Sequence, residues 1–167
     1  MIATEIMRAG FVGKLGLTGD VNVQQEEGRA LDVITDDIFK QVFANMDVVA
    51  AIASEEMEDV YSFEGERKGK YVLLIDPLDG SGNVEVDGPM GSIFSVHLRK
   101  SGKGKAELQD FLQPGGHQVV AGYILYGPST MFVYTAGGPV HGFTLDRAIG
   151  AFFLTHPGMR IPDGVGS

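Results

Sequence analysis

The segment Tyr71-Val-Leu-Leu-Ile-Asp-Pro-Leu-Asp-Gly-Ser-Gly-Asn83 joins a continuous apolar run to an acidic, glycine-rich stretch. The run Tyr71–Ile75 shows no alternation of apolar and polar residues, which is typical of a strand covered on both faces. Ligand sites in α/β proteins favour the carboxyl ends of such strands. We therefore expect a buried strand over Tyr71–Ile75 that leads directly into a functional turn.

The residues of this turn could bind both a cation and a phosphate. Asp76 and Asp79 are three positions apart across a turn begun by a proline, so their carboxylates can converge, and Leu78 offers its backbone carbonyl between them. Gly80 to Asn83 can present successive backbone N–H groups, a plausible nest for phosphate oxygens. An Asp-Pro-x-Asp-Gly segment is also a good turn without any ligand. The segment alone leaves both interpretations open.

A second acidic pair, Glu55 and Glu56, follows the apolar run Val48–Ala53. In isolation, such a pair is more often a solvated charge at the end of a strand. Strands that are sequential in the chain are usually neighbours in the sheet. If these two strands are neighbours, Glu55, Glu56, Asp76 and Asp79 share one rim.

A rim of this kind requires positive charge. Two like charges about 4 Å apart repel by about 4 kcal/mol at an effective dielectric constant near 20. Several carboxylates together are therefore unfavourable unless they take up protons or hold divalent cations. All-oxygen ligands select hard ions, Mg²⁺ first and Mn²⁺ as the alternative. The sequence thus predicts metal-assisted phosphate hydrolysis.

Composition and the remaining motifs exclude several other classes. The 167 residues carry a net charge of −9 and no cysteine, which argues against nucleic acid as a partner and removes disulfides and thiolate chemistry. The apolar runs are too short to span a membrane. Gly80-Ser81-Gly82 is not a nucleophile elbow, because Asp79 stands where that motif has its first glycine. The four histidines are too scattered for a zinc-hydrolase motif.

The rest of the chain predicts helices first and strands afterwards. Ile2–Ala9 resembles the end of a helix, and the glycines between Gly10 and Gly19 predict a loop. From Glu26 to Asn45 apolar residues recur every three or four positions, the period of an amphipathic helix. They are Leu31, Ile34, Ile38 and Val42.

Five further strands are expected, over Ser92–Leu98, Val119–Tyr126, Met131–Thr135, Val140–Leu145 and Phe152–Thr155. This order predicts a layered α/β (α+β) fold, a sandwich of helices on a mixed sheet. We expect one domain over residues 1–160 and a linker over residues 161–167, with the chain continuing beyond Ser167.

The segment Ile75–Asn83 resembles the signature of class I fructose-1,6-bisphosphatases, within the lithium-sensitive sugar-phosphate phosphatases. Other stretches match the family in order. They are Ser54-Glu55-Glu56, Gly69-Lys70-Tyr71-Val72, Gly91-Ser92-Ile93-Phe94-Ser95 and Gly142-Phe143-Thr144-Leu145-Asp146. The resemblance covers about Gly10 to His156 and implies the metal-binding N-terminal portion of such an enzyme.

The resemblance implies roles for individual residues. The positions that match the metal ligands of the family are Glu55, Asp76, Asp79 and the carbonyl of Leu78, with Glu26 as a further acidic residue near the metals. A departure at Gln25, where a glycine is common, leaves open whether Glu26 or Glu27 fills that place.

Asp32 and Glu56 match the pair credited with activating the attacking water. Gly80, Ser81 and Gly82 match the loop that holds the reacting phosphate, although Gly82 replaces the usual serine, which should loosen the loop. Lys70 and Tyr71 match positions that contact the phosphate of AMP in members inhibited by it. The helix that forms most of the AMP pocket is expected to be truncated here.

The resemblance further implies a function for the parent protein. We expect Mg²⁺-dependent removal of the 1-phosphate of fructose 1,6-bisphosphate in gluconeogenesis, in the cytoplasm, by a homotetramer. The C-terminal domain that grips the second phosphate is expected to be absent from this chain, so the fragment alone should be weakly active. The alternatives are a sedoheptulose-1,7-bisphosphatase and a non-catalytic module for metal binding or assembly.

Overall fold

The computed structural model describes residues 1–15, 22–63, 69–86, 88–102, 104–162 and 164. The side chains of residues 9–15, 22–29 and 85 lie outside this description. Within the described residues, no helix is both long and apolar enough to cross a membrane.

One mixed sheet organises the described chain, with strand order β2-β1-β3-β4-β5-β6-β7-β8. The strands are β1 (Val49–Ser54), β2 (Tyr61–Ser62), β3 (Tyr71–Asp79), β4 (Met90–Leu98), β5 (Gln118–Tyr126), β6 (Met131–Thr135), β7 (Val140–Asp146) and β8 (Ala151–Met159). The β1–β3 pair is parallel, and the other neighbouring pairs are antiparallel. The predicted α/β class with a mixed sheet is confirmed.

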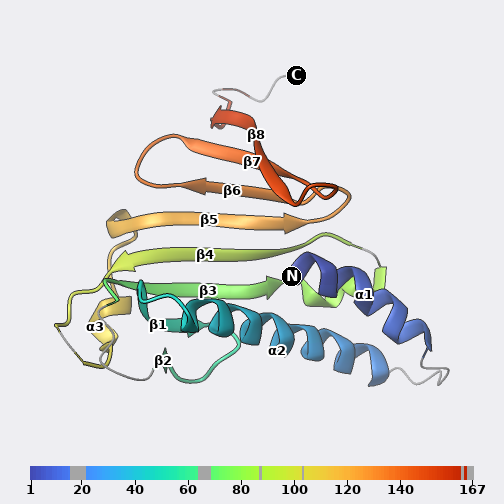
Figure 1. The fold of residues 1–167 in the computed structure, drawn as a ribbon, viewed down its shortest axis with the longest axis horizontal. Coiled ribbons are helices and arrows are strands. Elements are labelled where there is room, and N and C mark those ends of the chain that lie inside the picture. Colours follow the sequence, from blue (N-terminus) through green and yellow to red (C-terminus); the bar gives the residue numbers. More distant parts are fainter. Residues whose placement is uncertain (16–21, 64–68, 87, 103, 163, 165–167) are drawn as a thin grey trace.

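Two long helices, α1 (Ile2–Leu15) and α2 (Asn22–Ala44), lie at the end of the sheet formed by β1 and β3 (Figure 1). Short helices occur at η1 (Ser81–Val86), α3 (Leu108–Phe111) and η2 (Gly115–His117). The expected loop over Gly10–Gly19 is partly wrong, because α1 continues through Gly10 and Gly13 to Leu15. Helix α2 begins four residues before the predicted Glu26 and ends at Ala44.

Helix α2 buries a narrower stripe than its pattern predicts. Leu31 is 4% exposed and Thr35 is fully buried, with the Thr35 hydroxyl donating to the Leu31 carbonyl at 2.9 Å. Phe39 and Phe43 pack on the sheet, whereas Ile34 is 42% exposed. A polar threonine can take the buried position because the backbone carbonyl one turn earlier accepts its hydrogen bond.

The two faces of the β1–β3 half are covered by different helices. Leu73 and Ile75 pack with Phe39 of α2, whereas Val72 packs with Phe111 of α3. Alternate residues of a strand point to opposite faces, so α2 and α3 lie on opposite sides of β3. Both layers meet at β3, which carries the acidic motif, and this strand is therefore held from both sides.

Strand boundaries differ from the predictions mainly around β3 and β8. Strand β3 continues through Asp79 rather than ending at Ile75, so the acidic motif belongs to the strand and not to a free turn. Strand β8 runs to Met159, four residues beyond the expected end. The two-residue strand β2 and the four-residue helix α3 were not predicted, because elements this short carry no periodic signal.

Candidate active site

The carboxyl ends of β1 and β3 lie side by side. Ser54 is in register with Ile75 in the parallel ladder, and the Glu55 amide continues it by donating to the Ile75 carbonyl at 3.0 Å. The predicted adjacency of these strands is confirmed. Because the strands are parallel, the residues that follow them emerge at the same edge. Glu55 and Asp76 accordingly line one hollow of about 660 Å³.

A bulge in β3 reshapes the acidic motif. Asp76 is in register with Ile93 of β4, but Asp79 is in register with Gly91, so two residues of β3 stand opposite the single residue between them. In a regular strand, residues three apart point to opposite faces. A bulge breaks that alternation and re-aims side chains. It therefore allows Asp76 and Asp79 to serve one site. The sequence analysis expected the same convergence from a turn rather than from a bulge.

Helix α2 brings Asp32 to the same edge. The Ser81 hydroxyl donates to Asp32 Oδ2 at 3.1 Å, across 49 residues of sequence. Asp32 Oδ1 is buried and has no hydrogen-bond partner in the described part of the chain. The structure thus joins a residue expected to activate water to a residue expected to bind phosphate, and it leaves one buried carboxylate oxygen free to accept a further bond.

The carboxylates interact electrostatically. Burial raises the pKa of Asp76, and repulsion from Asp79, Glu55 and Asp32 raises it further, against the opposing hydrogen bond from the Leu78 amide to Asp76 Oδ1 at 3.1 Å. Burial also raises the pKa of Asp32; the bond from Ser81 opposes this, and repulsion from Glu55 adds to it. Helix α2, strand β3 and the residue after β1 therefore bring negative charge to one edge of the sheet.

Glu56 shows the largest shift in this group. Burial, repulsion from Asp32 and a hydrogen bond with Glu55 raise the pKa of Glu56 to about 7 from 4.5. Its side chain is nonetheless exposed at the rim, so water screens part of this repulsion. A carboxyl group poised near neutral pH is suited to accept and return a proton.

The predicted phosphate loop begins at Gly80, whose φ of +79° lies in the left-handed region that favours glycine. The Asn83 amide donates to the Gly80 carbonyl at 2.8 Å and starts the 3₁₀ helix η1. A Cβ atom at Gly82 would meet nothing within 4 Å. The loop therefore has room for the serine that the family resemblance leads one to expect there.

Other predicted site residues lie elsewhere. Tyr71 begins β3 and Lys70 directly precedes it, so both are five or more residues before Asp76, or roughly 16 Å along an extended strand. The Lys70 carbonyl accepts a bond from the Arg99 amide at 2.8 Å. These two residues are therefore not part of the acidic rim. The side chain of Glu26 lies outside the described residues.

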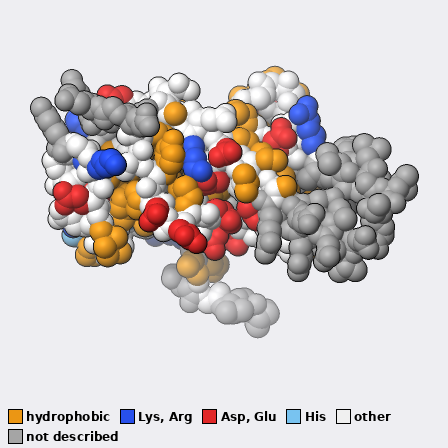
Figure 2. Space-filling model, turned by 90° about the horizontal axis from the view of Figure 1, so that it is seen from below, with side chains coloured by type: hydrophobic (Ala, Val, Ile, Leu, Met, Phe, Trp, Pro, Cys, Tyr) orange, Lys and Arg blue, Asp and Glu red, His pale blue; other side chains and the backbone are white. Residues whose placement is uncertain are grey.

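The chemistry of this rim fits a hard divalent cation, although the described side chains do not form a finished metal centre. Seen from the side of α2 and β2, acidic side chains gather near the middle of the molecule (Figure 2). Asp32 Oδ1 is a buried acceptor that receives no hydrogen bond from the residues that the structure describes. No group of three His, Cys, Asp or Glu side chains in the described ranges is arranged to hold a metal ion. Binding would therefore require these carboxylates to draw closer together.

Two buried hydroxyls beneath the motif escaped the sequence analysis. The Ser92 hydroxyl donates to the Pro77 carbonyl at 2.7 Å and lies 2.8 Å from the Tyr126 hydroxyl. The only sequence signal for them was Ser92, a serine on a strand expected to be buried. It stands opposite Pro77, whose missing N–H disturbs the hydrogen-bond ladder. Recognising that signal required the register of β3 against β4.

The chain is similar to known proteins over nearly its whole length. The family model described as fructose-1-6-bisphosphatase, N-terminal domain, matches residues 1–157. The class 1 fructose-1,6-bisphosphatase of Cytophaga hutchinsonii is 48% identical over 165 residues, covering 98% of this chain and 48% of that protein. The corresponding protein of Maridesulfovibrio salexigens is also 48% identical, and 49% of it is covered.

Solved structures agree. Leishmania major fructose-1,6-bisphosphatase in its holo form matches with a TM-score of 0.83 and 37% identity over 98% of this chain and 50% of that one. The T-state form of the same protein matches with a TM-score of 0.79. The chain thus spans about half the length of the curated relatives and the solved structures that it matches.

Proposed function

The chain belongs to the class 1 fructose-1,6-bisphosphatase family, whose N-terminal domain it carries, and on that premise we propose that it is the metal-binding half of an enzyme hydrolysing the 1-phosphate of fructose 1,6-bisphosphate. The products are fructose 6-phosphate and inorganic phosphate, and the metal is Mg²⁺ or Mn²⁺. One observation carries the proposal: carboxylates on α2, on β3 and directly after β1 meet at one edge, where burial and mutual repulsion raise the pKa of Asp32, Glu56 and Asp76.

The metal would be held by oxygens alone. Glu55, Asp76 and Asp79 would supply carboxylates, and Leu78 would supply its backbone carbonyl. A divalent cation bound there would neutralise the phosphate ester and lower the pKa of a bound water. Relief of the repulsion among the carboxylates would drive binding, because burial and the neighbouring carboxylates already raise the pKa of Asp76.

The remaining residues would manage the proton and the phosphate. Glu56, with a pKa of about 7, would take the proton of the attacking water. Asp32 would orient that water through Oδ1, which has no partner among the described residues, while Oδ2 holds Ser81 in place. Backbone N–H groups after Gly80 would bind the phosphate oxygens. Together these groups would position an in-line attack and stabilise its charge.

The hollow beside the carboxylates suggests what this half lacks. Among the described residues that line it, Glu55 and Asp76 are the only charged ones, and the others are mainly apolar, including Ile93, Tyr123 and Val133. A second phosphate on the sugar needs arginine or lysine donors. We propose that the other half of the full-length enzyme supplies them, and that this chain alone releases phosphate weakly.

Phosphate release separates the proposal from its alternative, a non-catalytic metal-binding module. The assay compares this chain with a chain extended at its C-terminus to the length of its relatives, using fructose 1,6-bisphosphate and Mg²⁺. We expect turnover by the extended chain and little by the short one. No turnover by the extended chain would favour the non-catalytic module, and equal turnover by both would refute the proposed division of labour. Sedoheptulose 1,7-bisphosphate in parallel determines which sugar is preferred.

A further inference from the structure

The acidic motif rests on a buried polar connection between three strands. Ser92 of β4 is 1% exposed and Tyr126 of β5 is 6% exposed. The Ser92 hydroxyl donates to the Pro77 carbonyl at 2.7 Å, and the two hydroxyls are 2.8 Å apart. Pro77 lies between Asp76 and Leu78, so the connection ends on the peptide that separates two of the proposed metal ligands.

The direction of these hydrogen bonds follows from counting protons. A serine hydroxyl has one proton, and in Ser92 that proton goes to the Pro77 carbonyl. The bond between the hydroxyls must then run from Tyr126 to Ser92. Burial raises the pKa of Tyr126, so the phenol keeps its proton at neutral pH. Hydrogen bonds in such a chain polarise and strengthen one another.

The position of Ser92 explains why this connection is needed. Ser92 is the residue of β4 that stands alone opposite the two bulged residues of β3, between the pairs Asp76–Ile93 and Asp79–Gly91. Pro77 has no N–H to donate to the ladder. A bulge at this point would leave backbone groups unsatisfied in a buried place, which is costly. The Ser92 side chain supplies a donor for the Pro77 carbonyl.

We infer that Ser92 and Tyr126 are positioning residues that hold the β3 bulge, and through it keep Asp76, the Leu78 carbonyl and Asp79 directed at one cation. The cation is the one invoked in the proposed function, on which this inference rests. Neither hydroxyl needs to touch substrate or metal. Their effect passes through the Pro77 carbonyl, which accepts the hydrogen bond of the Ser92 hydroxyl.

The first test needs no metal. The Leu78 amide, which donates to Asp76 Oδ1, reports on the bulge. In Ser92→Ala we expect hydrogen exchange at Leu78 to accelerate on the order of tenfold, the effect of one lost buried hydrogen bond. The Leu73 amide in the regular part of β3 should change less. Tyr126→Phe should give a smaller acceleration, and Ser92→Thr, which keeps the hydroxyl, should restore slow exchange.

The second test measures Mg²⁺ affinity by calorimetry at a temperature where every variant is folded. We expect Ser92→Ala to lower the affinity about tenfold relative to the unchanged chain. The matched control is Thr144→Val, which removes one member of another hydroxyl pair in the same sheet, Thr144 with Thr155 at 2.8 Å. The control should bind Mg²⁺ like the unchanged chain.

The two tests separate the failures. If the unchanged chain binds no Mg²⁺, the proposed metal site fails, while Leu78 exchange still decides whether Ser92 holds the bulge. Unaltered Leu78 exchange in Ser92→Ala would overturn the positioning role, as would a Ser92→Thr chain that exchanges as fast as Ser92→Ala. If the unchanged chain binds Mg²⁺ and Ser92→Ala binds it with the same affinity, the inference that Ser92 supports the metal site through the bulge would be overturned.

Discussion

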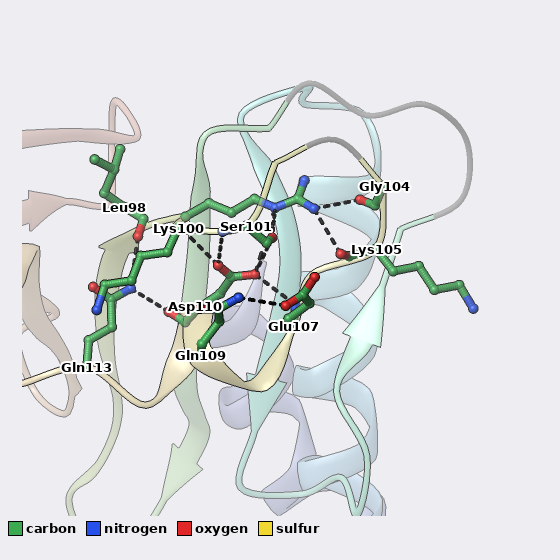
Figure 3. Close-up of polar contacts among 10 residues, drawn as sticks. Leu98, Lys100, Ser101, Gly104, Lys105, Glu107, Gln109, Asp110 and Gln113 are labelled. Carbon is green, nitrogen blue, oxygen red and sulfur yellow. Dashed lines mark hydrogen bonds and ion pairs between the residues drawn. The ribbon is translucent and has the colours of Figure 1, made fainter.

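The carboxylate of Asp110 and the carboxylates of the acidic rim have opposite surroundings. Asp110 of α3 is fully buried and accepts bonds from the Lys100 amide at 2.7 Å and the Glu107 amide at 2.7 Å (Figure 3). Ser101 donates to it twice, from its amide and its hydroxyl, both at 2.6 Å. At the acidic rim, by contrast, one buried oxygen of Asp32 has no hydrogen-bond partner within the described part of the chain.

The pKa values record this difference. Burial opposes ionisation of Asp110, but the donors from Ser101, Glu107 and Lys100 outweigh it and hold its pKa below 3.8. At the rim, burial raises the pKa of Asp76 and neighbouring carboxylates add to the shift. A carboxylate supplied with donors by its own chain stabilises the fold, whereas carboxylates that repel one another depend on protons or an external cation. The second group is therefore the candidate for function.

The largest expected effect is on turnover. In the extended enzyme, Asp32→Asn should lower the rate of phosphate release by about 10² to 10⁴, because the water that Glu56 deprotonates loses the carboxylate that orients it. Steady-state kinetics at saturating Mg²⁺ measure this loss. The melting temperature of the variant should not fall, because the change removes repulsion. Turnover within threefold of the unchanged enzyme would show that Asp32 does not act in the reaction.

The effect of Asp110 should be on stability instead. Asp110→Ala leaves several donors without an acceptor in a buried place, so we expect the free energy of unfolding to fall by about 3 kcal/mol. Urea denaturation followed by circular dichroism measures it. Asp37→Asn is the control, since the Asp37 side chain is 56% exposed and lies 3.5 Å from Lys40, and it should cost under about 0.5 kcal/mol. Equal losses of unfolding free energy in Asp110→Ala and Asp37→Asn would show that the buried donors around Asp110 do not stabilise the fold.

The two regions should also respond to pH with opposite signs. The pKa of Glu56 is raised in the folded chain, so the stability that its proton provides is present below pH 4.5 and is lost as the pH rises through about 7. Asp110 has a lowered pKa, so its contribution is present above pH 3.8 and is lost as the pH falls through the folded-state value.

Urea midpoints of the metal-free chain between pH 3 and pH 8 reveal both limbs. We expect Glu56→Gln to flatten the decline toward pH 7, and Asp110→Asn to flatten the decline at acid pH. Added Mg²⁺ should replace the protons and also reduce the neutral decline. If the loss of stability toward pH 7 is unchanged in Glu56→Gln, groups other than Glu56 cause it.

The smallest expected effect concerns the phosphate loop. Gly82→Ser has open space around the new side chain, and Gly82 has no positive φ, so the change should stabilise the chain by about 0.4–1 kcal/mol through lower entropy of the unfolded state. Thermal unfolding measures this gain, and Gly80→Ala is the contrasting variant, because Gly80 has a φ of +79°. A destabilised Gly82→Ser chain would show that the loop has no room for a side chain at position 82.

The sequence predicted those features of the fold that depend on long local patterns. The apolar runs gave the neighbouring strands β1 and β3, and the three-to-four period gave α2. Ile34 fits that period yet is exposed, because Thr35 and Phe39 take the buried side of the helix. Local pattern cannot decide between two adjacent faces when the partner surface is unknown.

The details of the site depended on register between strands. The sequence placed Asp76 and Asp79 in a turn, whereas the chain places them across a bulge whose existence depends on Gly91–Ile93 of β4. Asp110 carried no motif, since its donors come from a loop about ten residues earlier as well as from Glu107. Such roles appear only once distant segments are placed together.

Calorimetric titration with Mg²⁺ at pH 7 tests most directly whether the rim carboxylates await a cation. The unchanged chain should bind Mg²⁺ and release protons, because Glu56 is partly protonated at that pH. Asp76→Ala should abolish binding, and Asp110→Asn, measured where it is folded, should leave it intact. Mg²⁺ uptake by Asp76→Ala with the heat and affinity of the unchanged chain would contradict the metal site at this edge.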